Sequence, residues 1–296
     1  MMTSLNHVLG FDFGGTKAAI AIGAPDGSVV WEQRLQVADF DSAEELVTAA
    51  IRYGKAATEG MGIAAVGVAT MGVTTPEGID LAPNVNGWQT LNLWKMFHES
   101  FSCPVGFEND VRAALLAEQA WGNLRPYTYS AYLNLGSGIA LAFFLDGRLY
   151  KGAHQVAGEI GYAWEPGDLG YLDHHAPLEE RVGGLALNMK IQREFPGYES
   201  VLDAFHRGWH DPAVHAFLIR TLATIARYVG YALLAVDVEA VAVGGGISAQ
   251  FERIAPIFLA LWRRYLPKPP LVMNSAFYGR AGLMGALKVA WDSLGR

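Results

Sequence analysis

The sequence has very little cysteine: Cys103 is the single one among 296 residues. A disulfide within the chain needs two cysteines and a cysteine-rich zinc site needs several, so both are excluded. Cys103 precedes Pro104 in an apolar segment, which favours a buried thiol over a nucleophile.

Long apolar runs and clusters of basic residues are also missing. No tract reaches the roughly 18 consecutive apolar residues of a membrane span, and residues Met1–His7 do not resemble a signal peptide. The 22 basic and 29 acidic residues give a net charge of −7 without a basic cluster. We therefore expect a cytoplasmic protein that binds neither nucleic acid nor membrane.

The chain does have enough apolar residues for a large core, and one pattern occurs twice. Hydrophobic residues make up 51%, and the length is typical of about two domains. Residues 8–37 read as strand, glycine turn, strand, turn and strand, and the same order returns at residues 129–150. The repeat predicts two related sheets that each present a glycine turn to a shared cleft, although two unrelated hairpins would look the same.

Local signals predict several helices. Ser42 and Glu45 form a capping box, and a helix is expected from about Asp110 to Trp121. Asp211 followed by a proline predicts the start of a long helix that ends near Val236. A last helix is expected at residues 279–291.

The first glycine turn, Gly14-Gly15-Thr16-Lys17, has the residue types of a phosphate site. Glycines let backbone N–H groups approach phosphate oxygens closely, and Thr16 adds a hydroxyl. Asp12 precedes the turn and is suited to hold hydrated Mg²⁺. An ordinary Gly-Gly hairpin is the alternative.

This turn resembles the first phosphate motif of the ROK family of sugar kinases and repressors. Later segments are similar to further motifs of that family, in the same order along the chain. They are Pro83-Asn84-Val85-Asn86-Gly87-Trp88, Glu108-Asn109-Asp110, Leu135-Gly136-Ser137-Gly138, Gly158-Glu159-Ile160-Gly161, Pro177-Leu178-Glu179 and Val243-Gly244-Gly245-Gly246.

The resemblance implies an α/β protein with the duplicated actin-like ATPase (ribonuclease H-like) fold, in which two lobes surround a central cleft. We expect a small N-terminal lobe at residues 1–121, completed by a C-terminal helix at 279–296, and a large lobe at 122–278. The resemblance also implies ATP and Mg²⁺ as cofactors, a sugar substrate and a homodimer.

Individual site residues follow from the same resemblance. The nucleotide and its cation are assigned to Asp12, Gly14, Gly15, Thr16, Lys17, Gly136, Ser137, Gly138, Gly244, Gly245 and Gly246. The sugar is assigned to Asn84, Asn109, Asp110, Glu159, Tyr162 and Glu179.

Asp110 is the residue that the resemblance makes the general base. From the sequence alone, Asn109 or Asp110 is equally a cap of the helix that follows. A carboxylate at a helix N-terminus has its charged form favoured by the helix dipole, so we expect Asp110 to be ionised and weakly basic. Weak basicity suits a reaction in which deprotonation is late.

One segment departs from the family pattern. Tyr162 stands where most members have a histidine that leads into a zinc loop, and residues 163–176 contain no cysteine, so we expect no zinc site. The aromatic-rich loop either packs in place of the metal or stacks on the sugar. The alternative to a kinase is therefore a catalytically weak or inactive sugar-binding or regulatory protein. We expect no DNA-binding domain, because only Met1–His7 precede the first strand.

Overall fold

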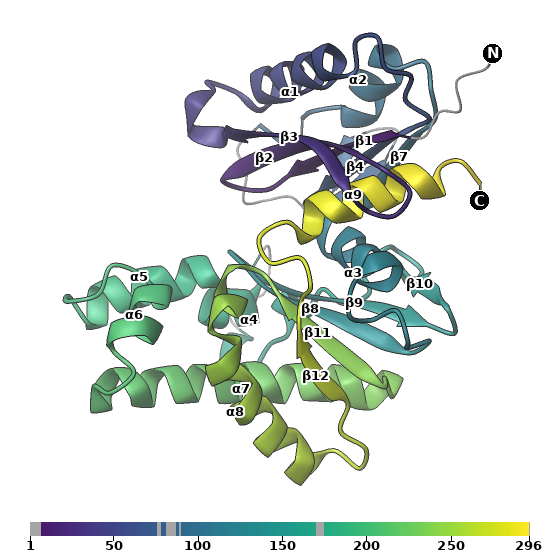
Figure 1. Cartoon of the computed structure of the whole chain (residues 1–296). Coiled ribbons are helices and arrows are strands. Elements are labelled where there is room, and N and C mark those ends of the chain that lie inside the picture. Colours follow the sequence, from purple (N-terminus) through teal and green to yellow (C-terminus); the bar gives the residue numbers. More distant parts are fainter. Residues whose placement is uncertain (1–6, 76–77, 81–86, 89, 170–174, 296) are drawn as a thin grey trace. The chain divides into compact units, whose positions relative to one another are not determined.

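The computed structural model describes residues 7–75, 78–80, 87–88, 90–169 and 175–295. The chain divides into two compact units, each with its own mixed sheet (Figure 1). Unit 1 comprises Met1–Arg125 together with Arg280–Arg296, and unit 2 comprises Pro126–Gly279.

Unit 1 contains a five-stranded sheet in the order β3-β2-β1-β4-β7. Strands β1, β2 and β3 are antiparallel neighbours, and β4 and β7 continue the sheet parallel to β1. The strands are β1 Val8–Phe13, β2 Lys17–Gly23, β3 Val29–Gln36, β4 Val66–Thr70 and β7 Val105–Asn109, with a separate pair β5 Val73–Thr75 and β6 Gly78–Asp80. The helices are α1 Ala43–Ala57, α2 Leu93–Ser100, α3 Asp110–Trp121 and α9 Ala281–Asp292, with the 3₁₀ turn η1 Val37–Asp39.

Unit 2 repeats this topology with the order β10-β9-β8-β11-β12. The strands are β8 Ser130–Leu135, β9 Ile139–Leu145, β10 Arg148–Tyr150, β11 Ala240–Gly244 and β12 Leu271–Asn274. The helices are α4 Pro177–Val182, α5 Gly184–Glu194, α6 Val201–Arg207, α7 Pro212–Val236 and α8 Phe251–Tyr265, with 3₁₀ turns η2 Ile160–Tyr162, η3 Pro166–Asp168 and η4 Gly246–Gln250. In both units a glycine turn joins the first two strands of the meander, so the predicted repeat is confirmed.

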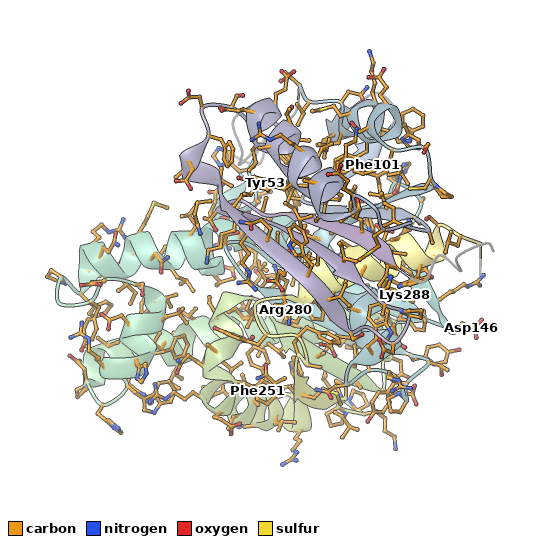
Figure 2. All side chains as sticks on the ribbon, turned by 45° about the horizontal axis from the view of Figure 1, so that its top comes forward. Tyr53, Phe101, Asp146, Phe251, Arg280 and Lys288 are labelled. Atoms are coloured by element: carbon orange, nitrogen blue, oxygen red, sulfur yellow. The ribbon has the colours of Figure 1, made fainter. Side chains whose placement is uncertain are left out.

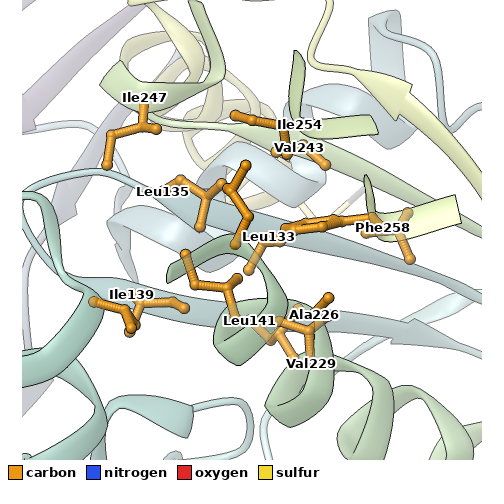
Figure 3. Close-up of a cluster of buried hydrophobic side chains, with 14 of the residues drawn as sticks. Leu133, Leu135, Ile139, Leu141, Ala226, Val229, Val243, Ile247, Ile254 and Phe258 are labelled. Atoms are coloured by element: carbon orange, nitrogen blue, oxygen red, sulfur yellow. The ribbon is translucent and has the colours of Figure 1, made fainter. Parts of the chain in front are cut away.

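Helix α7 forms much of the core of unit 2. Asp211 caps it as predicted, because its carboxylate accepts hydrogen bonds from the N–H groups of Ala213 and Val214. Ala226 and Val229 on α7 pack among the buried side chains of the sheet and of α8 (Figure 3). By length and composition α7 is apolar enough to cross a membrane, a test that the core helix of a globular protein also passes.

Helix α9 lies unusually close to the sheet of unit 1, because the strands under it carry glycines. A Cβ atom on Gly67 would lie 1.9 Å from the carbonyl oxygen of Ala286, and one on Gly10 would lie 2.9 Å from Leu287 Cδ2. The close approach brings the first turn of α9 to the carboxyl end of β1, where Asp12 lies.

Candidate active site

A row of paired residues crosses the sheet of unit 1 at Asp12. Strand registers align Arg34, Ala19, Asp12, Ala69 and Glu108 on β3, β2, β1, β4 and β7. Residues that pair directly point to the same face of a sheet, so the charged side chains share one face and the two alanines leave space beside Asp12.

The N-terminus of α9 meets the Asp12 carboxylate. A Cβ atom on Gly282, in the first turn of that helix, would lie 2.6 Å from both carboxylate oxygens. A helix N-terminus favours negative charge, and no side chain fits at position 282 without displacing Asp12. The glycine therefore keeps open the space that a hydrated cation beside Asp12 would need.

Glu32 connects the edge of the sheet to the start of α9. Its Oε1 accepts a hydrogen bond from Arg34 Nε at 2.7 Å, and its Oε2 accepts one from the Arg280 guanidinium at 2.5 Å. Arg280 is the N-cap residue of α9 and is labelled in Figure 2. These contacts fix Arg34 in the vicinity of Asp12.

The pKa of Asp12 is raised from 3.8 to about 7. Burial is the main cause, the neighbouring Asp110 carboxylate raises the pKa further, and Arg34 opposes both. A carboxylate whose charge is disfavoured by burial and by a second carboxylate forms an environment in which a cation is stabilised.

The first turn of α3 assigns different tasks to Asn109 and Asp110. Asn109 is the N-cap: its Oδ1 accepts hydrogen bonds from the N–H groups of Val111 at 3.0 Å and Arg112 at 3.2 Å. Its Nδ2 donates to the Gly72 carbonyl at 3.3 Å, and its second amide hydrogen has no partner among the described residues and can serve a ligand. Asp110 is the first helical residue, and its Oδ1 accepts from the Val111 N–H at 2.9 Å.

The expectation that Asp110 is weakly basic is wrong. Burial raises the pKa of this carboxyl and outweighs the lowering by the N–H groups of Val111 and Asp110 itself and by Arg112. The helix dipole was the only influence visible in the sequence, whereas desolvation depends on the packing around the residue. A raised pKa makes Asp110 a better proton acceptor.

A buried ion pair fixes the segment that carries both residues. Arg112 Nε donates to Glu108 Oε1 at 2.6 Å, and each side chain is only 4% exposed. The same Glu108 oxygen accepts the Asn109 N–H at 3.0 Å. The end of β7 and the first turn of α3 are thereby joined around Asp110.

Removing one partner of this pair should destabilise the protein strongly. We expect Arg112→Met to lower the free energy of unfolding by about 3–5 kcal/mol, because the Glu108 carboxylate is left buried without its cation. Urea denaturation measures the effect. The matched control is Arg52→Met on the exposed side of α1, expected to cost no more than about 0.5 kcal/mol. Equal losses for the two variants would contradict this role of Arg112.

The first glycine turn is closed by a hydrogen bond from the Gly14 N–H to the Lys17 carbonyl at 3.0 Å. This bond occupies Gly14, so the turn offers the N–H groups of Gly15 and Thr16 and the Thr16 hydroxyl. Gly15 has no positive φ, and a Cβ atom there would meet no described atom within 4 Å. Nothing in the described part of the chain requires glycine at position 15, and the space beside it is open.

The second glycine turn is held by its neighbours in unit 2. The Gly136 N–H donates to the Gly138 carbonyl at 3.1 Å. At the start of α5, the N–H groups of Gly184 and Leu185 donate to the carbonyls of Gly136 and Ser137 at 3.0 and 2.9 Å. Ser137 is exposed, and the turn offers its hydroxyl and the N–H groups of Ser137 and Gly138.

The third turn contains two glycines that the fold requires and one that it does not. Gly245 has φ +82°, and a Cβ atom there would lie 2.4 Å from the Leu135 carbonyl carbon. A Cβ on Gly244 would lie 1.8 Å from the Tyr132 hydroxyl, whereas one on Gly246 would meet no described atom within 4 Å. Gly246 is exposed and, like Gly15, is free to face a ligand.

Alanine substitutions should separate the two kinds of glycine. We expect Gly15→Ala to leave the melting temperature within about 2 °C of the unchanged protein, because the added methyl group meets no described atom. It should raise the KM for the ATP that the family resemblance implies. Gly245→Ala should lower the melting temperature by several degrees, because it strains the backbone and clashes with β8. A large stability loss from Gly15→Ala would contradict the assignment.

Glu179 lies between the second glycine turn and η2. Its Oε2 accepts the Ile139 N–H at 3.1 Å, and a Cβ on Gly138 would lie 2.0 Å from the same oxygen. A Cβ on Gly161 would lie 3.2 Å from Glu179 Cβ. Glu179 therefore holds the second glycine turn in place, independently of any contact with a sugar.

Tyr162 ends η2 and is 41% exposed. Burial of part of the ring raises the pKa of its hydroxyl, and the charges of Glu159 and Glu179 raise it further. The three predicted sugar-side residues of unit 2 are thus brought together. Asn84 lies outside the described residues, whereas Trp88 of the same motif is buried and donates to Thr70 Oγ1 at 3.1 Å.

The structure adds residues that sequence reasoning missed: Arg34, Gly282 and Asn134. The Asn134 side chain lies within 3.0 Å of where a Cβ on Gly136 or on Gly245 would stand, so it packs between two glycine turns of unit 2. A glycine in the first turn of an apolar helix was the available signal for Gly282. The registers that align Arg34 with Asp12 were not visible in the sequence.

Comparison with known proteins identifies the family of this chain. The sequence model described as the ROK family matches residues 8–293. The chain belongs to the ROK family. The resemblance drawn from the motifs is therefore confirmed over nearly the whole chain.

Individual ROK proteins are similar over most of their length. The N-acetylmannosamine kinase of Vibrio cholerae is 27% identical over 255 residues, which cover 81% of this chain and 84% of that protein. A ROK hexokinase from Thermus thermophilus has a TM-score of 0.78 at 25% identity and covers 98% of this chain and 99% of its own.

A ROK family glucokinase from Streptomyces griseus, solved with glucose and AMPPNP, has a TM-score of 0.78 at 24% identity. Its match covers 97% of this chain and 99% of its own. The predicted duplicated actin-like ATPase fold is confirmed by these ROK structures.

Proposed function

We propose that this ROK protein is an ATP-dependent kinase that phosphorylates a hydroxyl of a hexose or N-acetylhexosamine, with Asp110 as general base. One observation carries the proposal. At the carboxyl edge of the unit 1 sheet, the Asp110 carboxylate lies close enough to Asp12 to raise the pKa of Asp12. Beside them is a glycine turn whose Gly15 faces open space.

Asp110 would act on the sugar hydroxyl that attacks the phosphate. As the sugar oxygen forms its bond to the terminal phosphorus of ATP, the bond from that phosphorus to the ADP oxygen breaks, and the hydroxyl proton passes to the Asp110 carboxylate. Because such transition states are loose, the proton leaves late and a carboxylate is a sufficient base. The Val111 N–H engages Oδ1, so Oδ2 is the atom assigned to the proton.

Asp12 would hold Mg²⁺ through water. Within the described residues no cluster of three or more His, Cys, Asp or Glu side chains is placed to hold a metal. A magnesium ion would therefore take most ligands from water and phosphate, as this ion usually does. When bound, it would neutralise phosphate charge. The space that Gly282 keeps open beside the Asp12 carboxylate fits this arrangement.

The remaining residues would bind and orient the two substrates. The N–H and hydroxyl groups of Thr16 and Ser137 suit phosphate oxygens. Asn109, Glu159 and Tyr162 supply donors and acceptors for sugar hydroxyls. The names of the Vibrio kinase and of the glucokinase with glucose and AMPPNP support a sugar and ATP as the substrate pair.

Sugar-dependent release of ADP tests the proposal. We expect turnover with at least one of glucose, mannose, fructose, N-acetylglucosamine and N-acetylmannosamine. Binding of a sugar without ADP release would instead favour a sugar-binding or regulatory protein, the alternative that Tyr162 motivates. We also propose that the protein is cytoplasmic and that it forms a homodimer. Sedimentation at micromolar concentration would test the dimer.

A further inference from the structure

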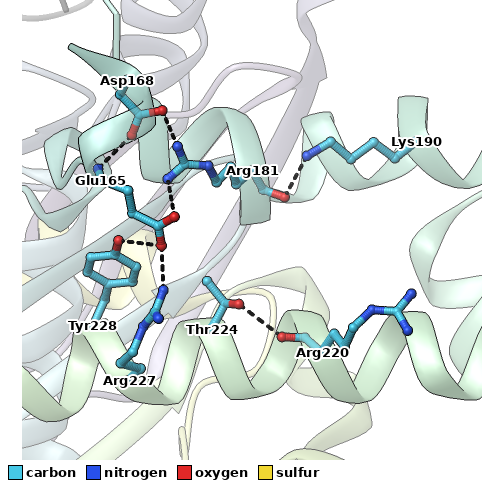
Figure 4. Close-up of polar contacts among 8 residues, drawn as sticks. All are labelled: Glu165, Asp168, Arg181, Lys190, Arg220, Thr224, Arg227 and Tyr228. Carbon is cyan, nitrogen blue, oxygen red and sulfur yellow. Dashed lines mark hydrogen bonds and ion pairs between the residues drawn. The ribbon is translucent and has the colours of Figure 1, made fainter.

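The segment that follows η2 is bound to two helices by a cluster of charged side chains (Figure 4). Glu165 precedes η3 and Asp168 ends it. Arg181 comes from α4, and Arg227 and Tyr228 come from α7. Contacts among these residues join elements that lie up to 63 positions apart in the sequence.

The cluster has a buried centre at Asp168, whose side chain is 2% exposed. Asp168 Oδ2 accepts the Glu165 N–H at 2.7 Å, and the Asp168 N–H donates to the Glu165 carbonyl at 2.8 Å. Arg181 donates from its guanidinium to the other carboxylate oxygen, Oδ1. Both oxygens of a buried charge are thereby satisfied, one by the backbone of its own turn and one by α4.

The outer part of the cluster is exposed to solvent. Glu165 Oε1 accepts a hydrogen bond from the Tyr228 hydroxyl at 2.9 Å and another from Arg227, and Arg181 lies 3.9 Å from Oε2. The side chains of Glu165 and Arg227 are 41% and 48% exposed. Water and salt screen such exposed pairs, so within this cluster the buried Asp168–Arg181 contact is expected to contribute most to holding the segment.

Helix α4 connects the Asp168–Arg181 contact, called the anchor below, to the candidate site. It also carries Glu179, which accepts the Ile139 N–H beside the second glycine turn and packs against Gly161 of η2. Tyr162 therefore lies between two attachments to α4, Gly161 against Glu179 and Asp168 against Arg181, and Glu159 lies two residues before the first of them. The Arg181 carbonyl in turn accepts a hydrogen bond from Lys190 on α5 at 3.0 Å.

We propose that Arg181 is a positioning residue for sugar binding: through Asp168 it holds the segment that carries Glu159 and Tyr162 in its binding geometry. The proposal rests on the sugar kinase function proposed above. Arg181 itself takes no part in proton or phosphoryl transfer. Loss of Arg181 should weaken sugar binding and leave the glycine turn that Glu179 holds in place.

Two methionine variants test this role, because both remove a guanidinium that contacts Glu165. We expect Arg181→Met to raise the KM for the best sugar of the panel about 10- to 100-fold, with the KM for ATP within about twofold. Arg227→Met, the matched control, should change either KM by no more than about twofold. Arg181→Lys keeps the charge without the forked geometry and should give an intermediate sugar KM.

Hydrogen exchange supplies a second measurement that does not require turnover. Amides in peptides covering residues 159–168 should exchange faster in Arg181→Met than in the unchanged protein, and Arg227→Met should match the latter. The double variant Asp168→Leu/Arg181→Met also removes the buried carboxylate that has lost its guanidinium partner, and it should recover part of the sugar affinity lost in Arg181→Met.

The outcomes separate this proposal from the function on which it rests. If the unchanged protein releases no ADP with any panel sugar, the kinase proposal fails, while the exchange of residues 159–168 and the Kd for glucose and N-acetylmannosamine still decide the role of Arg181. Faster exchange with an unchanged sugar KM or Kd would overturn positioning and leave a purely structural contact. Equal behaviour of Arg181→Met and Arg227→Met would overturn the anchor itself.

Discussion

Asp110→Asn should lower kcat by roughly 10²- to 10⁴-fold, the usual contribution of a positioned general base. An amide cannot accept the sugar hydroxyl proton, yet it has nearly the same size and leaves the first turn of α3 intact. Asn109 supplies the N-cap, so the substitution removes little helix stability. We expect the sugar KM to change less than kcat, because the lost interaction belongs to the transition state.

Steady-state kinetics over a range of sugar and ATP concentrations measure the effect. Asp211→Asn is the matched control, because it makes the same change at the N-terminus of α7, where the carboxylate only caps the helix. It should retain nearly full activity, since Asp and Asn are equivalent caps. Equal activity of Asp110→Asn and Asp211→Asn would show that Asp110 is a cap and not a base.

Asp12→Asn should abolish most activity and at the same time stabilise the metal-free protein at alkaline pH. The activity falls because the carboxylate assigned to hydrated Mg²⁺ is gone. The stability rises because the charged form of Asp12 is disfavoured in the folded state, where its pKa is about 7 compared with 3.8. Function and stability therefore conflict at this position.

The sign follows from proton binding. A raised carboxyl pKa means that the folded state holds its proton more tightly, so the contribution of Asp12 to stability falls as the pH rises from about 4 to about 7. The pKa difference corresponds to at most about 4 kcal/mol above pH 7. Asparagine does not titrate and escapes this loss.

Urea denaturation at pH 8 and pH 5 in a chelating buffer tests the prediction. Asp12→Asn should be more stable than the unchanged protein at pH 8, and this advantage should shrink at pH 5. Added Mg²⁺ should stabilise the unchanged protein more than the variant. A variant whose stability relative to the unchanged protein is the same at both pH values would contradict the raised pKa.

The elements of the fold that depend on local sequence were predictable. Asp211 before a proline marked the start of α7, and two glycine turns flanked by apolar strands marked the repeat. Both signals act over a few residues, where capping geometry and strand alternation leave few options. Family motifs then ordered these elements into one fold.

The environment of the site depended on contacts between distant segments. Gly282 approaches Asp12 across 270 positions of sequence, and Arg34 reaches it through strand register. No local pattern encodes such contacts, which explains why the basicity of Asp110 was predicted with the wrong sign. Desolvation depends on what α9 and the sheet bury around the carboxyl, and only the packed structure shows that.

The contact that holds the sugar-side segment could not be predicted from the sequence either. The cysteine-free loop indicated either packing or stacking on a sugar. The structure shows that residues 165–168 are held by an ion pair between Asp168 and Arg181. These two residues are 13 positions apart, and no spacing rule in the sequence identifies them as partners. Trp164 of the same loop is 52% exposed.

The central claim is that the protein transfers phosphate from ATP to a sugar with Asp110 as the base. Phosphorus NMR of ATP, Mg²⁺ and the sugar panel, incubated with the unchanged protein and with Asp110→Asn, tests it most directly. The account predicts a sugar phosphate resonance that grows together with ADP in the unchanged protein and is slowed at least about a hundredfold in the variant. A sugar phosphate that forms at the same rate in both proteins, or in neither, would contradict it.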